Sequence, residues 1–279
     1  MSEINLEQWI GRQELLEEVL GEAQAQAAAA TLDRDSTAFV AGAALPLLWH
    51  WFYFVPRAPQ ARLNRDGHPQ RGDFMPPITL PRRMFAGSTL DIWQPLKLGL
   101  PTRREGEIRA ISQKTGRSGT LAFVTVGYRY FQAGQLCLEE EQAIVYREPG
   151  VPLAAPIPSE LPPVPAGAWT RMVTPDPRLL FRFSALTFNA HRIHYDRPYA
   201  TGEEGYPGLV VHGPLTAVLL LELVCEHYVG PITSFSFRGL APLFDLHPFR
   251  LVAIPHANEV ALEAHGPDGS IAMRATAGW

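Results

Sequence analysis

Residues 181–196 read FRFSALTFNAHRIHYD, and residues 206–224 read YPGLVVHGPLTAVLLLELV. The first segment begins with alternating apolar and polar residues and then breaks into a polar turn that carries Asn189, His191 and His194. The second segment is almost entirely apolar after its proline and glycine. A polar turn that lies just before a long apolar segment is typical of a site built against the core of a domain.

The apolar part of the second segment predicts a buried helix over residues 214–228, because its leucines and valines recur at helical spacing. His212 and Gly213 would stand at the start of this helix. There, free backbone N–H groups and the positive end of the helix dipole can receive an oxygen that gains negative charge. A histidine-bearing turn beside such a helix start favours acid–base chemistry next to an oxyanion hole.

The composition describes an ordinary globular protein. The chain has 279 residues, 46% of them hydrophobic and 19% charged, which is enough for two domains of about 100–150 residues. A net charge of −4 argues against a nucleic-acid partner. The two cysteines, Cys137 and Cys225, do not make a disulfide framework or a metal motif, so we expect a reducing, cytoplasmic location. We expect no secretory signal at the start of this sequence and no membrane-spanning segment.

The first third of the chain holds three features. Residues 4–30 are predicted to be helical, since they contain an apolar stripe followed by a run of alanines. The aromatic segment 46–54 fits either a core element or the wall of an apolar tunnel. Residues 56–83 are rich in proline and glycine and predict a long functional or mobile loop. At its end, Arg82 and Arg83 either bind an anion or are solvated side chains.

The remaining segments predict long antiparallel strands. Seven prolines between residues 149 and 168 indicate an extended linker, which gives an N-terminal domain over 1–148 and a C-terminal domain over 169–279. Both halves then show a helix followed by strands. The strands are expected at 105–112 and 121–131, joined by a turn at 116–119, and at 136–146, 232–238, 249–254, 259–264 and 271–276.

Together with LPRRMFAG at residues 80–87 and the proline-rich linker, the two quoted segments resemble the MaoC-like superfamily of R-specific enoyl-CoA hydratases. The resemblance is closer to its hydroxyacyl-thioester dehydratase type 2 branch, which includes mesaconyl-C4-CoA and itaconyl-CoA hydratases. It covers nearly the whole chain. It implies an α+β double hot-dog fold, with two antiparallel sheets that each wrap around a long helix. The first domain would be a diverged partner and the second would carry the catalytic motif.

The hydratase motif of this superfamily runs Asp, any residue, Asn-Pro, any residue, His, any residue, Asp. On this chain, His194 falls on the motif histidine, Asp196 on the trailing aspartate, and Gly213 on the glycine whose N–H forms the oxyanion hole. Asn189 replaces the leading aspartate, and His191 with Arg192 replaces Asn-Pro. An asparagine can hold a water molecule by hydrogen bonds but cannot take its proton.

These assignments predict the roles of the site residues. His194 would transfer protons, because histidine titrates near neutral pH, while Asn189 would fix the water and Gly213 would meet an enolate oxygen. For His191 a structural role is favoured. The predicted substrate-binding residues are Arg82, Arg83, Arg192 and His212, and Arg192, Arg197 and Arg238 are candidates for CoA phosphates or ordinary surface residues.

The implied function is a hydro-lyase that adds water to a branched C5-dicarboxylyl-CoA, itaconyl-CoA or mesaconyl-C4-CoA, and gives citramalyl-CoA. The alternatives are a 3-hydroxyacyl-thioester dehydratase of fatty-acid synthesis and a non-catalytic acyl-CoA binding module. We expect an acyl-CoA as the small-molecule partner, no separate cofactor and no metal, since His191 and His194 lack an accompanying carboxylate–histidine helix motif. A homodimer is left open.

Overall fold

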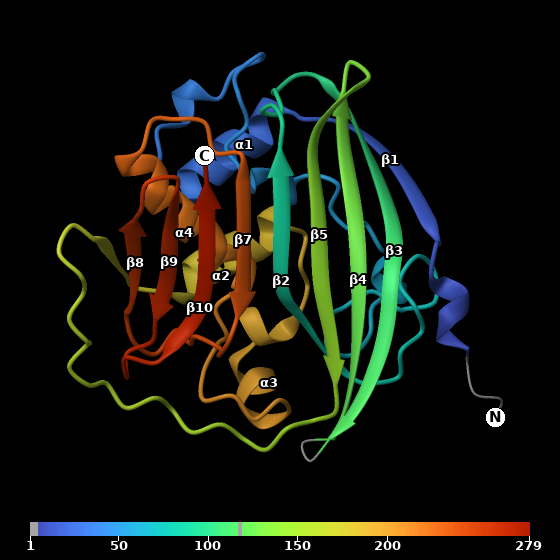
Figure 1. The fold of residues 1–279 in the computed structure, drawn as a ribbon. Coiled ribbons are helices and arrows are strands. Elements are labelled where there is room, and N and C mark those ends of the chain that lie inside the picture. Colours follow the sequence, from blue (N-terminus) through green and yellow to red (C-terminus); the bar gives the residue numbers. More distant parts are fainter. Residues whose placement is uncertain (1–4, 117–118) are drawn as a thin grey trace.

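The computed structural model describes residues 5–116 and 119–279 of the protein (Figure 1). Within these residues, ten strands form one antiparallel sheet in the order β1-β3-β4-β5-β2-β7-β10-β9-β8-β6. The strand bounds are β1 Gln13–Val19, β2 Arg82–Ile92, β3 Pro101–Gly116, β4 Gly119–Gln132, β5 Gln135–Arg147, β6 Trp169–Val173, β7 Ser234–Gly239, β8 Phe249–Pro255, β9 Glu259–His265 and β10 Ile271–Gly278.

The sheet consists of two halves with the same internal strand order. Read inward from each outer edge, the first half runs β1-β3-β4-β5-β2 and the second runs β6-β8-β9-β10-β7. Strands β2 and β7 pair antiparallel and join the halves, with Gly87 opposite Arg238 and Leu90 opposite Phe235. A Cβ on Gly87 would lie 2.4 Å from the carbonyl oxygen of Phe237, so the closeness of these two strands requires a glycine there.

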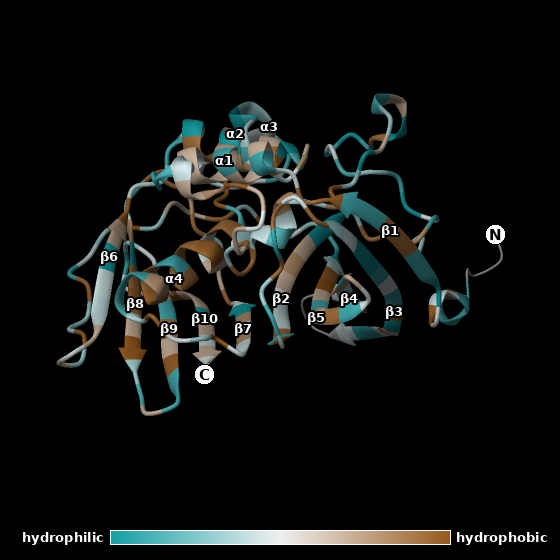
Figure 2. Cartoon of the chain, turned by 90° about the horizontal axis from the view of Figure 1, so that it is seen from above, coloured by the Kyte–Doolittle hydropathy of each residue, from teal (hydrophilic) through white to brown (hydrophobic). Residues whose placement is uncertain are grey.

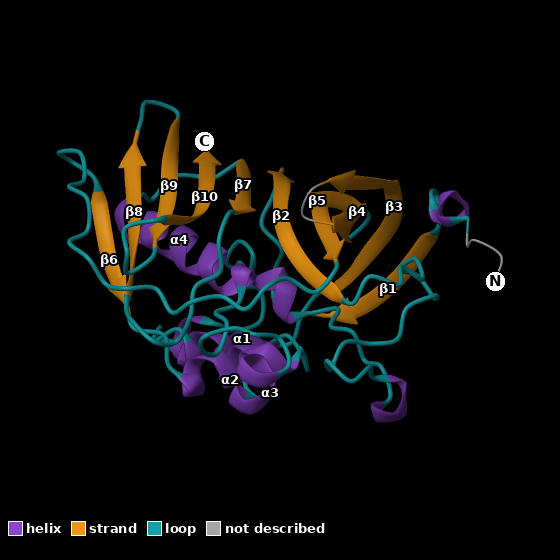
Figure 3. Ribbon diagram, turned by 90° about the horizontal axis from the view of Figure 1, so that it is seen from below, coloured by secondary structure: helices purple, strands orange, loops and turns teal. Residues whose placement is uncertain are grey.

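The helices lie on one side of this sheet in two layers (Figure 3). The long helix α4 packs against the strands of the second half, and α1, α2 and α3 cluster beyond it. The strands of the first half curl strongly instead of enclosing such a helix (Figure 2). The helix bounds are α1 Glu22–Thr31, α2 Pro177–Leu186, α3 Arg197–Gly202 and α4 Gly213–His227, with 3-10 turns η1 Leu6–Trp9, η2 Ser36–Ala38, η3 Trp49–Phe52, η4 Gln60–Arg62 and η5 Arg192–His194.

One expectation about the first half is wrong. The segment 4–30, as far as it is described, is not one helix: β1 occupies Gln13–Val19, and only the alanine-rich part from Glu22 forms α1. The apolar stripe misled because Leu15 and Val19 lie on an edge strand and are 59% and 54% exposed. The described strands also form one continuous sheet rather than two, because β2 and β7 pair across the boundary between the halves.

Most other elements agree with the sequence. The hairpin of β3 and β4, the strand β5 and all four strands after α4 lie where they were expected, although the centre of the predicted turn at 116–119 falls outside the described residues. Residues 148–168 contain no helix or strand and run in an extended course around the second half (Figure 1). No helix in the described part of the chain combines the length and apolar character that crossing a bilayer requires.

Helix α4 is the centre of the hydrophobic core, as the prediction for residues 214–228 required. Nine of its residues are buried, and its one acidic residue within this buried stretch, Glu222, accepts hydrogen bonds from Arg34 at 2.9 Å and from the indole of Trp49 at 3.2 Å. The helix therefore lies between the sheet and the layer that contains α1 and α2. Its N-terminus is fixed in place for the site described below.

We expect Leu220→Ala in α4 to destabilise the protein by about 2–5 kcal/mol, because it removes a fully buried side chain and leaves a cavity. Leu240→Ala is the matched control, since Leu240 is 47% exposed and exposed substitutions change stability by about 0.5 kcal/mol or less. Denaturant unfolding of both variants measures the difference. Equal stabilities would contradict the central position of α4.

Candidate active site

The turn after α2 presents the amide of Asn189 in a defined orientation. The helix ends at Leu186, the backbone turns with Phe188 at a φ of 48°, and the N–H of Asn189 donates to the carbonyl of Ser184 at 2.8 Å. Asn189 Oδ1 accepts the backbone N–H of His191 at 3.0 Å. Because its oxygen is used in this way, Asn189 offers its amide N–H groups to a ligand.

His194 is buried and held in a single tautomer. Its Nδ1 lies 2.7 Å from the carbonyl oxygen of Val210. A carbonyl can only accept a hydrogen bond, so Nδ1 carries the proton and Nε2 carries the lone pair. Burial lowers the pKa of His194 to about 4, and the imidazole is neutral at pH 7. The ring stacks on that of His212 with 3.6 Å between the ring centroids.

His212 and Gly213 start α4, as the sequence predicted. His212 is the N-cap residue, and its Nε2 lies 2.8 Å from the hydroxyl of Ser184 on α2. Gly213 is the first residue of the helix and Pro214 follows it. The N–H of a first helical residue has no acceptor within the helix, so the N–H of Gly213 is available to an oxygen at the positive end of the helix dipole.

A tight turn from the first half docks directly onto the Asn189 turn. The N–H of Arg192 donates to the carbonyl of Asp66 at 2.9 Å, and its guanidinium donates to the carbonyl of Arg65 at 3.2 Å. Gly67 has a φ of 94°, and a Cβ there would lie 1.7 Å from the carbonyl oxygen of Ala190. Only a glycine allows this approach, so the turn is fixed against the motif of the second half.

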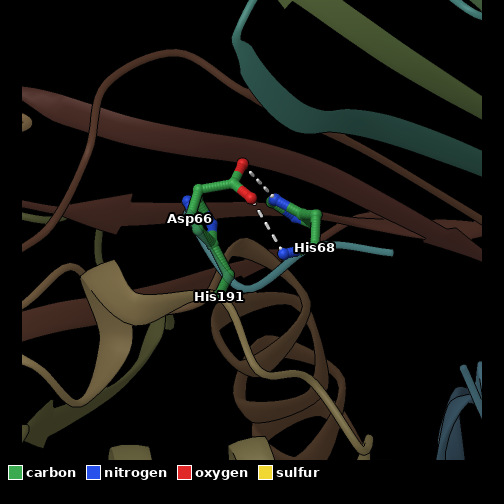
Figure 4. Close-up of side chains that lie close together, drawn as sticks. All are labelled: Asp66, His68 and His191. Carbon is green, nitrogen blue, oxygen red and sulfur yellow. Dashed lines mark hydrogen bonds and ion pairs between the residues drawn. The ribbon is translucent and has the colours of Figure 1, made fainter. Parts of the chain in front are cut away.

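This docked turn places Asp66 and His68 next to His191 (Figure 4). The carboxylate of Asp66 accepts the backbone N–H of His68 at 2.9 Å and lies 3.0 Å from its Nδ1. The rings of His68 and His191 are 4.1 Å apart between centroids. The three side chains have ligand atoms within 4.8 Å of one another, a spacing compatible with a metal ion. The positive charges of Arg71 and Arg83 act on His68, however, and they disfavour a cation at this position.

A cavity of about 600 Å³ opens between the two halves. The second half contributes Asn189 and Ala190 from the turn and His212 from the start of α4, while the first half contributes His68, Arg83 and many aromatic side chains. His194 is not among the described residues that line this cavity. Its ring stacks on that of His212, which does line the cavity. A cavity of this size fits the acyl part of a small ligand.

The aromatic segment 46–54 serves as both core and cavity wall. Trp49 and Phe52 are buried in the core, whereas Trp51 lines the cavity. The indole of Trp51 donates to the fully buried carboxylate of Glu140 at 3.0 Å. Glu140 also accepts hydrogen bonds from Ser88, at 2.8 Å, and Gln142, at 2.9 Å, and its other oxygen lies 3.0 Å from His50 Nε2.

The predicted arginines separate into two groups. Arg82 forms an ion pair with Glu204 at 3.1 Å, with its side chain 10% exposed, and Arg192 forms one with Asp196 at 2.8 Å. Arg83 is half-buried and lines the cavity, and within the described residues it forms no ion pair. Arg83 is therefore the predicted arginine that remains free to meet a ligand. Of the other two candidates, Arg197 pairs with Asp245 and Arg238 is exposed.

Asp66, His68 and Glu140 were not predicted as site residues. The long loop at 56–83 was expected to be functional, but nothing in its sequence told which residues would face the second half. The available signal was the sequence Asp66-Gly67-His68, in which an aspartate two residues before a histidine can accept both its backbone and its ring N–H groups.

The antiparallel sheet packed against the buried helix α4, with His212 at the start of that helix, has the architecture that the sequence resemblance to MaoC-like dehydratases implies, and the comparisons agree. Residues 48–245 match the family model of hydroxyacyl-thioester dehydratase type 2. A solved MaoC-like dehydratase superposes with a TM-score of 0.73 over 98% of this chain and 99% of its own at 14% identity, which establishes the α+β fold. The chain belongs to the hydroxyacyl-thioester dehydratase type 2 family.

Two relatives show how the chain is placed within this family. It is 65% identical to the mesaconyl-C(4)-CoA hydratase of Chloroflexus aurantiacus over 276 residues, which cover 99% of this chain and 98% of that protein. It is 29% identical to the mitochondrial hydroxyacyl-thioester dehydratase type 2 of Schizosaccharomyces pombe, over 73% of this chain and 75% of that protein.

We expect Gly67→Ala to abolish most of the activity that depends on the cavity, because the added Cβ would push the docked turn away from Ala190. Gly42→Ala is the matched control: Gly42 also has a positive φ, 81°, but has no atom within 4 Å of an added Cβ. Both variants carry backbone strain of about 1 kcal/mol, so the difference between them isolates the contact. Turnover and the thermal midpoint are measured for both variants. Equal turnover and equal midpoints in the two variants would contradict the role of the contact.

Proposed function

We propose that this protein adds water across the double bond of mesaconyl-C4-CoA and gives citramalyl-CoA. The observation that carries the proposal is the 65% identity to a mesaconyl-C(4)-CoA hydratase along nearly the full length of both chains. The site described above offers the groups that this reaction requires. Itaconyl-CoA, an isomeric C5-dicarboxylyl thioester, is the related substrate to test beside it.

We also propose that the two halves are two hot-dog units, with domain boundaries at 1–148 and 169–279 and a linker at 149–168. Three features support this division: the same strand order in each half, the single long pairing between β2 and β7, and the extended course of the linker. In this view the second unit keeps its long helix, α4, and the first unit has a substrate cavity on the concave side of its sheet.

Hydration of a conjugated thioester first places negative charge on the thioester oxygen, as the water oxygen bonds to the β-carbon. We assign that oxygen to the N–H of Gly213 at the start of α4. A single preorganised donor of this kind contributes about 3–4 kcal/mol to the stability of a transition state. The helix dipole acts in the same direction and needs no rearrangement.

His194 and Asn189 are assigned to the attacking water. The neutral imidazole of His194 has a lone pair on Nε2, which accepts a hydrogen bond from the water. The amide N–H of Asn189 donates a hydrogen bond to the water oxygen. His212 lies between His194 and the cavity, so water reaches His194 at the edge of the His212 ring. In this assignment His212 helps to shape the binding site beside the thioester.

Arg83 is assigned to the free carboxylate of the substrate. A buried carboxylate needs a partner of opposite charge, and an arginine can bind it through two parallel hydrogen bonds. Of the two arginines predicted for this role, Arg82 already pairs with Glu204, whereas Arg83 lines the cavity. Arg192, which pairs with Asp196 at the surface, stays a candidate for the CoA phosphates.

The S. pombe relative supports a second candidate function, the dehydration of 3-hydroxyacyl thioesters in fatty-acid synthesis. The two functions differ in the acyl group that must fit the cavity. A dicarboxylyl group requires a cation such as Arg83, whereas a long acyl chain requires an apolar channel. A panel of substrates therefore distinguishes them, and a non-catalytic binding module would turn over none of them.

We expect the wild-type protein to hydrate mesaconyl-C4-CoA or itaconyl-CoA faster than crotonyl-CoA and long-chain enoyl-CoAs in a coupled absorbance assay. We expect His194→Ala to lower this rate by about 10- to 100-fold, because the attacking water loses a hydrogen-bond acceptor that is worth about 1–3 kcal/mol. Faster turnover of long-chain substrates would favour the fatty-acid function. Undiminished turnover by His194→Ala would remove His194 from the mechanism.

Arg83→Met should raise KM for mesaconyl-C4-CoA strongly and leave crotonyl-CoA nearly unaffected, because only the first substrate has a carboxylate to pair. Loss of one charge-assisted pair corresponds to about 10- to 100-fold. Arg182→Met is the matched control, since Arg182 is exposed on α2 and does not line the cavity. An unchanged ratio of kcat/KM between the two substrates would show that the carboxylate binds elsewhere.

A further inference from the structure

The proposed hydration leaves one problem open, which is where the proton of the water goes. Asn189 cannot take up this proton, because its side chain is an amide, and its oxygen already accepts the N–H of His191. An imidazolium at His194 would have only the carbonyl of Val210 on its other nitrogen, and burial lowers the pKa of His194 to about 4. Both residues can hold the water, but neither provides a carboxylate that would stabilise the transferred proton.

His68 has the carboxylate partner that His194 and Asn189 lack. Its Nδ1 lies 3.0 Å from a carboxylate oxygen of Asp66, so Nδ1 carries the proton and Nε2 carries a lone pair. The structure shows no protein hydrogen bond to His68 Nε2 in the described ranges 5–116 and 119–279. His68 also lines the same cavity as Asn189. Its environment therefore combines a free lone pair with a carboxylate on the far side of the ring.

We propose that His68 is the catalytic base that receives the proton of the attacking water, and that Asp66 is the positioning residue that orients its ring and stabilises the imidazolium. This inference rests on the proposed hydration. The carboxylate–histidine pair of the first half would then take over the proton-accepting role that Asn189 cannot perform in the second half. The catalytic groups would come from both halves of the chain.

The step balances with one proton. As the water oxygen bonds to the β-carbon, one O–H bond breaks and its proton moves to His68 Nε2. The electron pair of the double bond moves to the thioester oxygen, which faces the N–H of Gly213. The imidazolium then returns its proton to the α-carbon as the thioester carbonyl re-forms. His194 accepts a hydrogen bond from the second hydrogen of the water, and this hydrogen stays bonded to oxygen in the product hydroxyl.

The protonation state at rest agrees with this role. Burial lowers the pKa of His68, and the nearby charges of Arg83 and Arg71 lower it further, although the hydrogen bond and the charge of Asp66 oppose them. At neutral pH the ring is therefore ready to accept a proton. Burial raises the pKa of Asp66, but the hydrogen bonds from His68 outweigh it, so the carboxyl stays ionised. Among other groups near the ring, His191 has a pKa well below its usual value through burial.

The position of His68 is rigid, as a base requires. Asp66 is held through its carbonyl by the N–H of Arg192, and Gly67 packs against the carbonyl of Ala190. Both contacts are made to the turn that carries Asn189. The loop thus holds His68 in a fixed position on the cavity that Asn189 also lines, and an acid–base group is effective only when it is held within hydrogen-bond reach.

The test compares His68→Gln, His68→Ala and Asp66→Asn with the wild type. Glutamine keeps hydrogen-bonding capacity but cannot take up the proton. His256→Gln is the matched control, because His256 is exposed on the loop after β8. For each variant, kcat and KM are measured with the enoyl-CoA that the wild type hydrates fastest, together with the thermal midpoint and turnover in added imidazole.

We expect both His68 variants to lose about 10²–10⁴-fold in kcat, with KM and thermal midpoint close to those of the wild type. We expect Asp66→Asn to lose less, and imidazole to restore part of the turnover of His68→Ala, the variant with space for it. A merely structural role for His68 would instead lower the midpoint or raise KM, without rescue. A kcat of His68→Gln within about threefold of the wild type, well short of the loss of a general base, would overturn the inference.

The same measurements separate this inference from the proposed function. If the wild type hydrates a different enoyl-CoA and its kcat still depends on His68, the substrate assignment fails and the role of His68 stands. Activity that a chelator removes and Zn²⁺ restores would overturn the inference, because Asp66, His68 and His191 would then be metal ligands. A wild type that hydrates no enoyl-CoA would overturn both proposals.

Discussion

The close pairing of β2 with β7 is the contact on which the rest of the structure depends. It turns ten strands into one sheet, and it is possible because Gly87 has no side chain to collide with the carbonyl of Phe237. Strand β2 also begins at the end of the long loop that contains Asp66 and His68. The pairing therefore sets the position of the first half relative to α4, and the contact between Gly67 and Ala190 completes the alignment.

Electrostatically, the site is a group of neutral histidines beside Arg83, an arginine for which the described part of the chain provides no ion partner. Burial lowers the pKa values of His68, His191, His194 and His212, so at neutral pH these rings offer lone pairs and little charge. The positive charge in the cavity then comes from Arg83, Arg71 and the start of α4, since the other two arginines that line it, Arg57 and Arg104, pair with Glu18 and Glu14. On the proposed function this arrangement suits an anionic substrate, because charged histidines would compete with Arg83 for the substrate carboxylate and could not accept a proton from water.

The sequence predicted those parts of the protein whose signal is local. Periodicity predicted helix α4 and the strands of the second half, and the point where the alternation breaks predicted the Asn189 turn. The family motif located His194 and Gly213, whose catalytic roles stay predictions. The segment 4–30 failed because an exposed edge strand carried an apolar stripe at helical spacing. The position of Asp66 and His68 beside the Asn189 turn could not be predicted, since it depends on a docking contact with residues more than 120 positions away in the chain. The same holds for Arg82, whose pairing with Glu204 was not predictable from its neighbours.

The matching strand order of the two halves has a consequence for stoichiometry. Two identical units paired through their equivalent strands would be related by a twofold axis and would carry two equal sites. Here the axis is broken, because only the second half places a long buried helix against its sheet, and only the loop before β2 crosses over to meet it. On the proposed function, we therefore expect each polypeptide to bind one acyl-CoA, in the cavity between the two halves.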